Sequence, residues 1–90
     1  MKIEWDPNKA RSNRRKHGVS FEEAATALYD TLSVTGADPD HSHGEVRYIT
    51  FGMSGKGRLL VVSHTESADT IRIISARTAS KGERKIYEEG

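Results

Sequence analysis

The sequence has no cysteine among its 90 residues. This absence excludes a disulfide scaffold, a thiolate metal site and a cysteine nucleophile. The longest apolar run, Leu59–Val62, has only four residues, whereas a membrane-spanning helix needs about 20. No signal peptide precedes the first charged residues. We therefore expect a soluble protein of the cytoplasm that has no contact with a membrane.

Large apolar side chains are also scarce. Hydrophobic residues make up 34% of the chain, and eight of them are alanine. A domain of this size buries roughly 60–65% of the surface of its unfolded chain, which leaves little excess stability. We expect one domain over residues 1–90 that gains stability from a partner.

The charges nearly cancel, with 14 basic and 13 acidic residues, but their distribution is uneven. Residues 1–17 carry six basic and two acidic groups, whereas residues 18–47 carry six acidic groups and one basic group. A basic face would attract a polyanion and an acidic face would attract a basic protein. The same counts also fit a mixed, solvated surface.

Hydrophobic periodicity, caps and turn residues predict eight elements in the order β-α-α-β-β-β-β-α. The expected helices cover 7–17, 21 to about 30 and 81 to about 89, and the expected strands cover 1–5, 31–35, 45–53, 58–64 and 71–77. Ser20–Glu23 and Ser80–Glu83 each have the capping-box pattern at a helix start. Consecutive strands with short connections favour an antiparallel sheet. The predicted class is α+β, a compact antiparallel sheet with two N-terminal helices and one short C-terminal helix on one face.

Two arginines interrupt the apolar strand predicted over 71–77. Strict alternation places Arg72 and Arg77 on opposite faces of that strand, and each breaks a run of apolar side chains. Arginine is suited to bidentate recognition of phosphate. The alternative is that both are surface residues and that Arg77 pairs with a carboxylate.

Three further side chains have chemistry that the sequence leaves open. His64 ends its predicted strand and is either an acid–base group or a structural residue. Tyr87 lies one helical turn from Arg84, so it either donates to a phosphate that Arg84 neutralises or packs on the sheet. His17-Gly18 marks the end of a helix, and the basic run Arg14–His17 either contacts a phosphate backbone or contacts nothing.

A loop rich in oxygen and imidazole groups is the one candidate for a metal site. It holds Asp38, Asp40, His41, His43 and Glu45. Their spacing matches no established metal template. We therefore predict no metal site and no cofactor.

Several blocks of the sequence together resemble the BrnT family of type II toxins. They are Trp5-Asp6-Pro7, Lys16 to Ala24, Arg72 to Arg77, and Glu83-Arg84 with Tyr87. The resemblance implies a RelE-like fold and a metal-independent endoribonuclease that cleaves RNA and arrests translation and growth. It also implies a cognate antitoxin of the BrnA type with a ribbon-helix-helix part, so that operator DNA is bound only through the toxin–antitoxin complex.

The resemblance also suggests roles for individual residues. Arg72 and Arg77 would stabilise the charge on the phosphorane, and Arg84 would assist them. His64 is the acid–base candidate, and Tyr87 would donate a proton or stack on a base. The RNA-binding candidates on the first helix are Lys9, Arg14 and Lys16. The sequence departs from the family at Ser67-Ala68, where relatives often have Arg-Gly.

A second class of function is compatible with the same features. A non-catalytic nucleic-acid-binding module, or a co-repressor derived from a toxin, would share the basic helix and the arginines. Such a protein would need no acid–base group.

Overall fold

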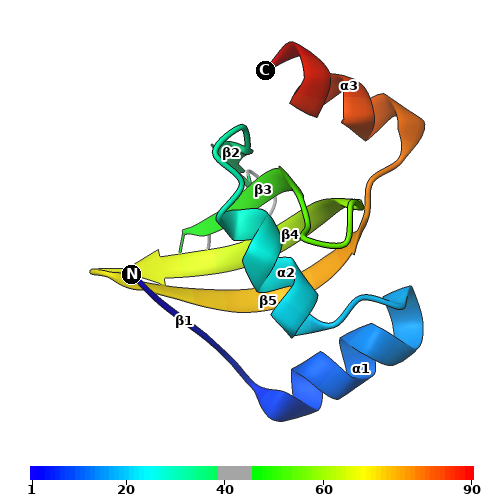
Figure 1. The fold of residues 1–90 in the computed structure, drawn as a ribbon. Helices are drawn as coiled ribbons and strands as arrows, with labels where there is room; N and C mark the ends of the chain where they lie inside the picture. The colour runs from blue at the N-terminus through cyan, green and yellow to red at the C-terminus, as the bar shows by residue number, and fades with distance from the viewer. Residues whose placement is uncertain (39–45) are drawn as a thin grey trace.

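The computed structural model describes residues 1–38 and 46–90 (Figure 1). Its elements follow the predicted order. They are β1 (Lys2–Trp5), α1 (Pro7–His17), α2 (Phe21–Leu28), β2 (Val34–Ala37), β3 (Arg47–Met53), β4 (Leu59–Ser67), β5 (Thr70–Thr78) and α3 (Lys81–Glu89). The main shift is in β2, which was expected to begin at Thr31. Asp30 forms a turn there, because its side chain accepts from the Leu32 N–H and its carbonyl from the Ser33 N–H.

The five strands form one sheet in the order β1-β5-β4-β3-β2. The pairs from β2 to β5 are antiparallel, as the short connections predict. The prediction of a wholly antiparallel sheet is wrong for β1, which pairs with β5 in parallel. Hairpin rules do not apply to these two strands, because the rest of the chain forms the crossover between them. The class remains α+β, with a mixed sheet.

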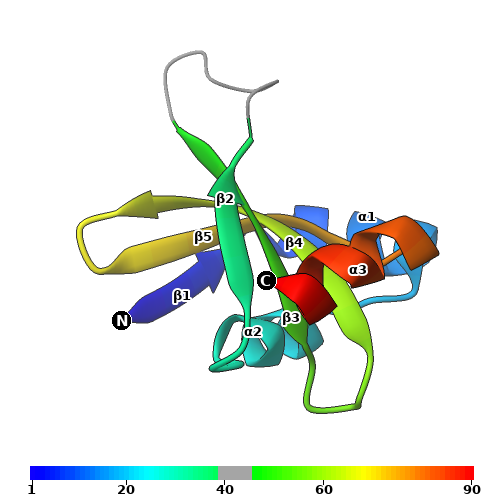
Figure 2. The ribbon, with the colours of Figure 1, turned by 90° about the horizontal axis from the view of Figure 1, so that it is seen from above.

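The core lies between the sheet and the two N-terminal helices. It contains Val19, Phe21, Ala24, Ala27, Leu60, Val62, Ile73 and Ala76. We call this side of the sheet the helix face and the opposite side the open face. The expectation that all helices pack on one face fails for α3, which lies on the other side of the sheet from α1 and α2 (Figure 1). From above, α3 covers only one end of the open face (Figure 2).

A β-bulge in β5 changes which side chains face the core. Ser63 is opposite Ser75, but the next residue of β4, His64, is opposite Ile73, so Ile74 is an extra residue. Ile73 and Ala76 can then both enter the core, although they are three residues apart. Strict alternation had placed Arg72 and Arg77 on opposite faces. The bulge puts them on the same open face.

A buried asparagine joins α1 to the edge of β5. The Asn13 side chain is 6% exposed, and its amide donates to the Ala76 carbonyl at 2.8 Å and to the Val19 carbonyl at 3.0 Å. Its Oδ1 accepts from the Ala76 N–H at 3.0 Å. The last β1–β5 pair is Trp5 with Ile73. Asn13 therefore satisfies the backbone of β5 where β1 no longer reaches.

A buried carboxylate holds α2 against the β3–β4 hairpin. Glu23 accepts from the Arg58 Nε at 2.9 Å and from the Ser54 hydroxyl at 2.7 Å. The Arg58 guanidinium lowers the pKa of Glu23. The capping box predicted at Ser20 is therefore only half present. The Ser20 hydroxyl accepts from the Glu23 N–H, whereas the Glu23 carboxylate bonds to the hairpin.

We predict that Asn13→Ala lowers the free energy of unfolding by about 3 kcal/mol. The substitution leaves the N–H and C=O of Ala76 without partners in a buried position, and each such group costs about 1–3 kcal/mol. Urea unfolding followed by circular dichroism measures the change. Ser12→Ala, on the same helix, is the control and should stay within about 0.5 kcal/mol. An Asn13→Ala protein as stable as the control would contradict this role.

Candidate nucleic-acid interface

The open face of β5 presents a strip of hydrogen-bond donors. Arg72, Ser75 and Arg77 share this face because of the bulge. Ser63 lies opposite Ser75, and Thr65 lies between Arg72 and Arg47 in the register of three strands. Guanidinium and hydroxyl groups on one surface can donate to several phosphate oxygens. We call Arg72, Ser75 and Arg77 the β5 strip.

Arg77 is held by the first turn of α3. Its Nη1 and Nη2 each donate to one oxygen of Glu83 at 2.7 Å. The Glu83 carboxylate also accepts from the Ser80 N–H, which completes the predicted capping box. The Arg77 guanidinium lowers the pKa of Glu83 from its usual 4.5 to about 2, and the same bond raises the pKa of Arg77.

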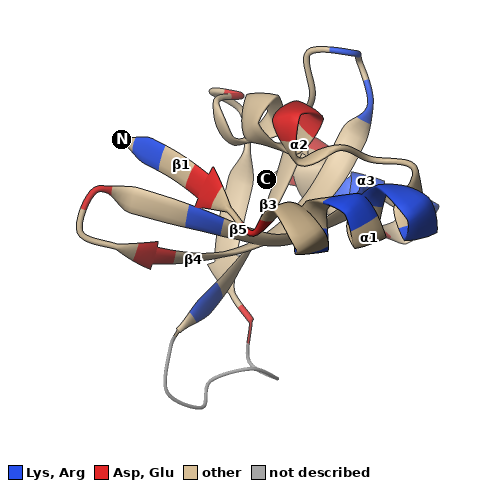
Figure 3. Ribbon diagram, turned by 90° about the horizontal axis from the view of Figure 1, so that it is seen from below, with Lys and Arg blue, Asp and Glu red and all other residues tan. Residues whose placement is uncertain are grey.

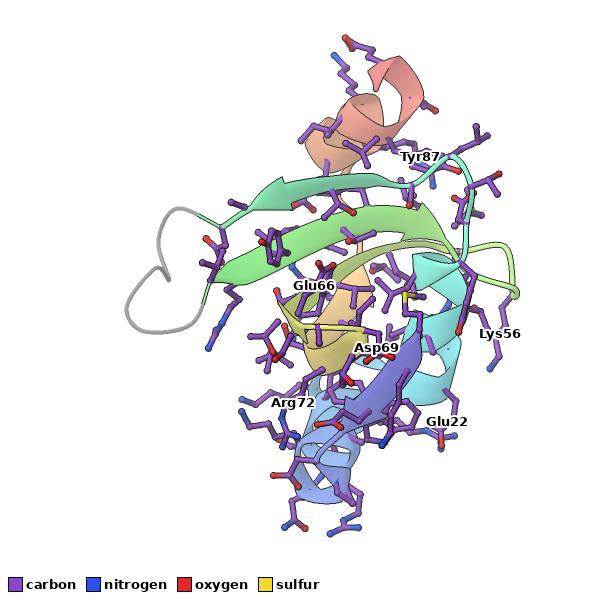
Figure 4. All side chains as sticks on the ribbon, turned by 90° about the vertical axis from the view of Figure 1, so that its left-hand side faces the viewer. Glu22, Lys56, Glu66, Asp69, Arg72 and Tyr87 are labelled. Carbon is purple, nitrogen blue, oxygen red and sulfur yellow. The ribbon has the colours of Figure 1, made fainter. Side chains whose placement is uncertain are left out.

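Arg72 pairs with Glu4 of β1, with 2.8 Å between Nη1 and Oε2. The acidic residues Glu66 and Asp69 lie at the turn between β4 and β5, near the same end of the sheet (Figure 4). Both arginines are therefore paired with carboxylates in the free protein. The arginine side chains remain nearly half exposed, at 48% for Arg72 and 46% for Arg77. Exposed ion pairs contribute only about 0–1 kcal/mol, so a phosphate can displace the carboxylates.

A pocket of about 200 Å³ lies between α1 and the bulge of β5. It is lined by Lys9, Ser12, Asn13, Lys16, His17, Ile74 and Ser75. None of the described residues that line it is acidic. Ser75 belongs to the β5 strip as well, so the two predicted lysines lie beside the strip. We call this cavity the α1–β5 pocket.

The arginines and His64 lie on opposite faces of the sheet. His64 is 1% exposed and stacks on Tyr48, with ring centroids 5.9 Å apart. Its Nε2 lies 2.7 Å from the Thr50 hydroxyl, and its Nδ1 lies 3.7 Å from Glu66. Burial lowers the pKa of His64, so the ring is neutral at pH 7. The structure therefore does not bring His64 to the β5 strip.

Tyr87 fastens α3 to the turn after α2. Its hydroxyl donates to Asp30 Oδ2 at 2.6 Å, and this bond lowers the pKa of Asp30 and raises the pKa of Tyr87. Figure 4 shows Tyr87 and Arg72 at opposite ends of the molecule. Arg84 is exposed and makes no ion pair with a described residue. Among the described residues, neither Arg84 nor Tyr87 forms a hydrogen bond or ion pair with Arg72 or Arg77.

The remaining predicted residues fall elsewhere. Arg14 lines a separate cleft with Trp5 and Phe21, away from the α1–β5 pocket. Four residues of the loop weighed as a metal site, Asp40, His41, His43 and Glu45, lie outside the described residues. Within residues 1–38 and 46–90, no cluster of three or more histidine or acidic side chains is arranged to hold a metal ion. No helix in these ranges is long and apolar enough to span a membrane.

The charged residues are distributed over several elements of the fold. Figure 3 shows basic positions on α1 and on the β3–β4 hairpin, and acidic positions on the neighbouring α2 and at the β4–β5 turn. The two signs therefore lie side by side on this face, as in the ion pairs of Arg58 with Glu23 and of Arg72 with Glu4. The side of α1 that carries Lys9 and Lys16 continues into the β5 strip through Ser75.

Comparisons with a protein family and with solved structures give matches. Residues 5–83 match the family described as the ribonuclease toxin, BrnT, of type II toxin-antitoxin systems. The crystal structure of the Brucella abortus ribonuclease toxin, BrnT, superposes with a TM-score of 0.65 at 25% sequence identity. The superposition covers 90% of this chain and 99% of that one. No curated protein sequence matches the chain.

We predict that the Glu83–Arg77 pair gives the protein a pH-dependent stability. The folded-state pKa of Glu83 lies below 4.5, so its contribution is complete above pH 4.5 and disappears as the pH falls towards 2. At pH 7 the free energy of unfolding of the wild type should exceed that of Glu83→Gln by about 1 kcal/mol, because nearly half of the Arg77 side chain is exposed. Urea titrations between pH 7 and 2 measure the difference. Glu89→Gln is the control, and a Glu83 difference that persists at pH 2 would refute the prediction.

Proposed function

This chain belongs to the BrnT family of ribonuclease toxins of type II toxin-antitoxin systems, and from that premise we propose that it cleaves RNA at Arg77. One observation supports the location. The β5 bulge places Ser75 on the strand face that carries Arg77, and Ser75 also lines the α1–β5 pocket with Lys9 and Lys16. We propose a RelE-like endoribonuclease that stops translation and growth.

The reaction uses the RNA's own 2′-hydroxyl as the nucleophile. The 2′-oxygen bonds to the neighbouring phosphorus and the bond to the 5′-oxygen breaks. Negative charge grows on the phosphorane, and donors fixed in advance around it lower the barrier. The Arg77 guanidinium supplies such donors once the phosphate has displaced Glu83. This positive charge fills the role that a metal ion has in other nucleases, so we propose a metal-independent reaction.

The other cations bind the RNA on either side of the scissile phosphate. Arg72 is five residues from Arg77, which is roughly 15 Å along a strand. The two arginines therefore contact different phosphates. Lys9 and Lys16 hold a third one in the α1–β5 pocket, and Arg84 approaches from α3. Arg14 lies on the other flank of α1 and contacts RNA only if the strand passes around that helix.

His64 and Tyr87 have a structural role in this proposal. His64 is buried on the helix face, so it acts on the RNA only if the sheet opens. Tyr87 is bonded to Asp30 and would have to leave this partner to reach a base or a leaving group. We propose that both residues act chiefly by holding the sheet and α3 in place.

We further propose that a cognate BrnA-like antitoxin, with a ribbon-helix-helix part, neutralises the protein in the cytoplasm. Four large apolar side chains are exposed around β2, β3 and α3, namely Tyr29, Leu32, Val46 and Ile86. Burying them would stabilise a small domain that has few core residues. Operator DNA would be bound only through the complex.

One feature favours the alternative of a non-catalytic nucleic-acid-binding module or co-repressor. Both arginines of the β5 strip have carboxylate partners, and these partners reduce their attraction for RNA. A protein of this kind would bind operator DNA as an isolated chain and leave RNA intact.

We predict that Arg77→Ala slows RNA cleavage roughly 10²–10³-fold, as expected for the loss of one donor to a developing oxyanion. Gel analysis of a labelled RNA measures the rate, with EDTA present to test metal independence. Arg15→Ala removes the same charge from an exposed site on α1 and is the matched control. Equal rates for wild type and Arg77→Ala would remove Arg77 from the mechanism.

We predict that the chain and the antitoxin encoded beside it elute together in size-exclusion chromatography at micromolar concentration. The complex should also abolish the growth arrest caused by the chain alone. Separate elution would count against the partner. Binding of operator DNA by the isolated chain, without loss of RNA, would support the co-repressor alternative.

A further inference from the structure

RNA cleavage through the 2′-hydroxyl needs a group that accepts the hydroxyl proton. A good general base has a pKa near the working pH. Among the described residues near Arg77, Glu83 is bonded to Arg77 and to the Ser80 N–H at the start of α3. The phenol of Tyr87 is bonded to Asp30, and His64 is buried on the other face of the sheet. The residues proposed from the sequence therefore leave this task unfilled.

His17 is the described histidine beside the bulge of β5. It is the last residue of α1, it is exposed, and it lines the α1–β5 pocket together with Lys9 and Lys16. Ser75 lines the same pocket. Ser75 and Arg77 are two residues apart on one strand face, which is about 7 Å. Ser75 therefore connects the pocket that His17 lines with the strand face that carries Arg77.

The position of His17 is fixed by a buried contact. Asn13 lies one helical turn before His17, so the two side chains are neighbours on α1. The two bonds between Asn13 and Ala76 hold this side of the helix against β5. His17 consequently keeps its place beside the bulge although its own side chain is solvated. Among described residues it has no hydrogen-bond or ion-pair partner that would occupy its ring.

We infer that His17 is the acid–base residue of RNA cleavage, a role that rests on the proposed function. A nitrogen of its ring accepts the proton of the 2′-hydroxyl while the 2′-oxygen bonds to phosphorus. The bond between phosphorus and the 5′-oxygen breaks, and the 5′-oxygen takes a proton from water. The products are a 2′,3′-cyclic phosphate and a 5′-hydroxyl, and His17 then releases its proton to solvent.

Lys9 and Lys16 define the substrate class of the pocket. Together with Ser12 and Ser75, these lysines line a space of about 200 Å³ that has no described acidic lining. This chemistry fits one phosphate of a single-stranded RNA. A phosphate bound there brings the adjacent ribose to the rim of the pocket, where His17 lies.

The test is the pH dependence of single-turnover cleavage by wild type, His17→Ala and His17→Gln. We expect the rate to fall roughly 10²-fold in both variants, within the range for general acid–base catalysis. The acidic limb of the pH–rate profile should also disappear, and added imidazole should restore part of the rate in His17→Ala. Arg15→Ala, two residues earlier on the helix, is the control for a change of charge.

Two measurements distinguish misfolding of the His17 variants from a loss of proton transfer. Circular dichroism and urea unfolding check that the variants are folded, and imidazole cannot rescue a misfolded protein. His64→Gln is measured in parallel. If it loses the acidic limb while His17→Ala keeps it, the proton transfer belongs to His64 and the inference is overturned.

The inference and the proposed function fail in different ways. If the wild type cleaves RNA and His17→Ala cleaves it with the same rate and pH–rate profile, the role of His17 is overturned and the ribonuclease activity is not. A wild-type protein that leaves RNA intact overturns both. If the wild type cleaves RNA, and His17→Ala cleaves it slowly and is partly rescued by imidazole, both are supported.

Discussion

The contact between Asn13 and Ala76 is the interaction on which the candidate interface depends. A sheet edge presents unpaired N–H and C=O groups, and β1 covers the edge of β5 only as far as Ile73. The Asn13 amide satisfies the next backbone groups from a helix instead of a strand. Because the Asn13 side chain takes the place of a strand partner, α1 lies against β5. This position places Lys9, Lys16 and His17 beside β5. A side chain that could pair only once would leave either the N–H or the C=O unsatisfied.

The bulge at Ile74 is the second constraint. It adds one residue where β4 has none, so that two core residues three positions apart both face the helices. The consequence for chemistry is that Arg72 and Arg77 lie on one surface. Their carboxylate partners, Glu4 and Glu83, occupy them in the free protein. Exposed pairs of this kind are weak, and a polyanion with regularly spaced phosphates competes well for both guanidinium groups.

The C-terminal helix has few tertiary contacts, and the β4–β5 turn has an unfavourable backbone conformation. None of the residues of α3 is fully buried, and its fixed points are the bonds from Glu83 to Arg77 and from Tyr87 to Asp30. Ala68 in the turn has a φ of 53°, a conformation that glycine adopts more easily than alanine.

Local sequence was sufficient for the elements, because caps and turn residues act over a few neighbours. The order β-α-α-β-β-β-β-α, the cap at Asp6, the end of α1 at Gly18 and the capping box of α3 were all predictable. The resemblance to the BrnT family was visible in short blocks. Only the tertiary structure decided the parallel partner of β1, the bulge, the burial of His64 and the place of His17. Each of these depends on segments up to 68 residues apart, and pairing at that range is set by packing of the whole core and leaves no pattern in adjacent residues.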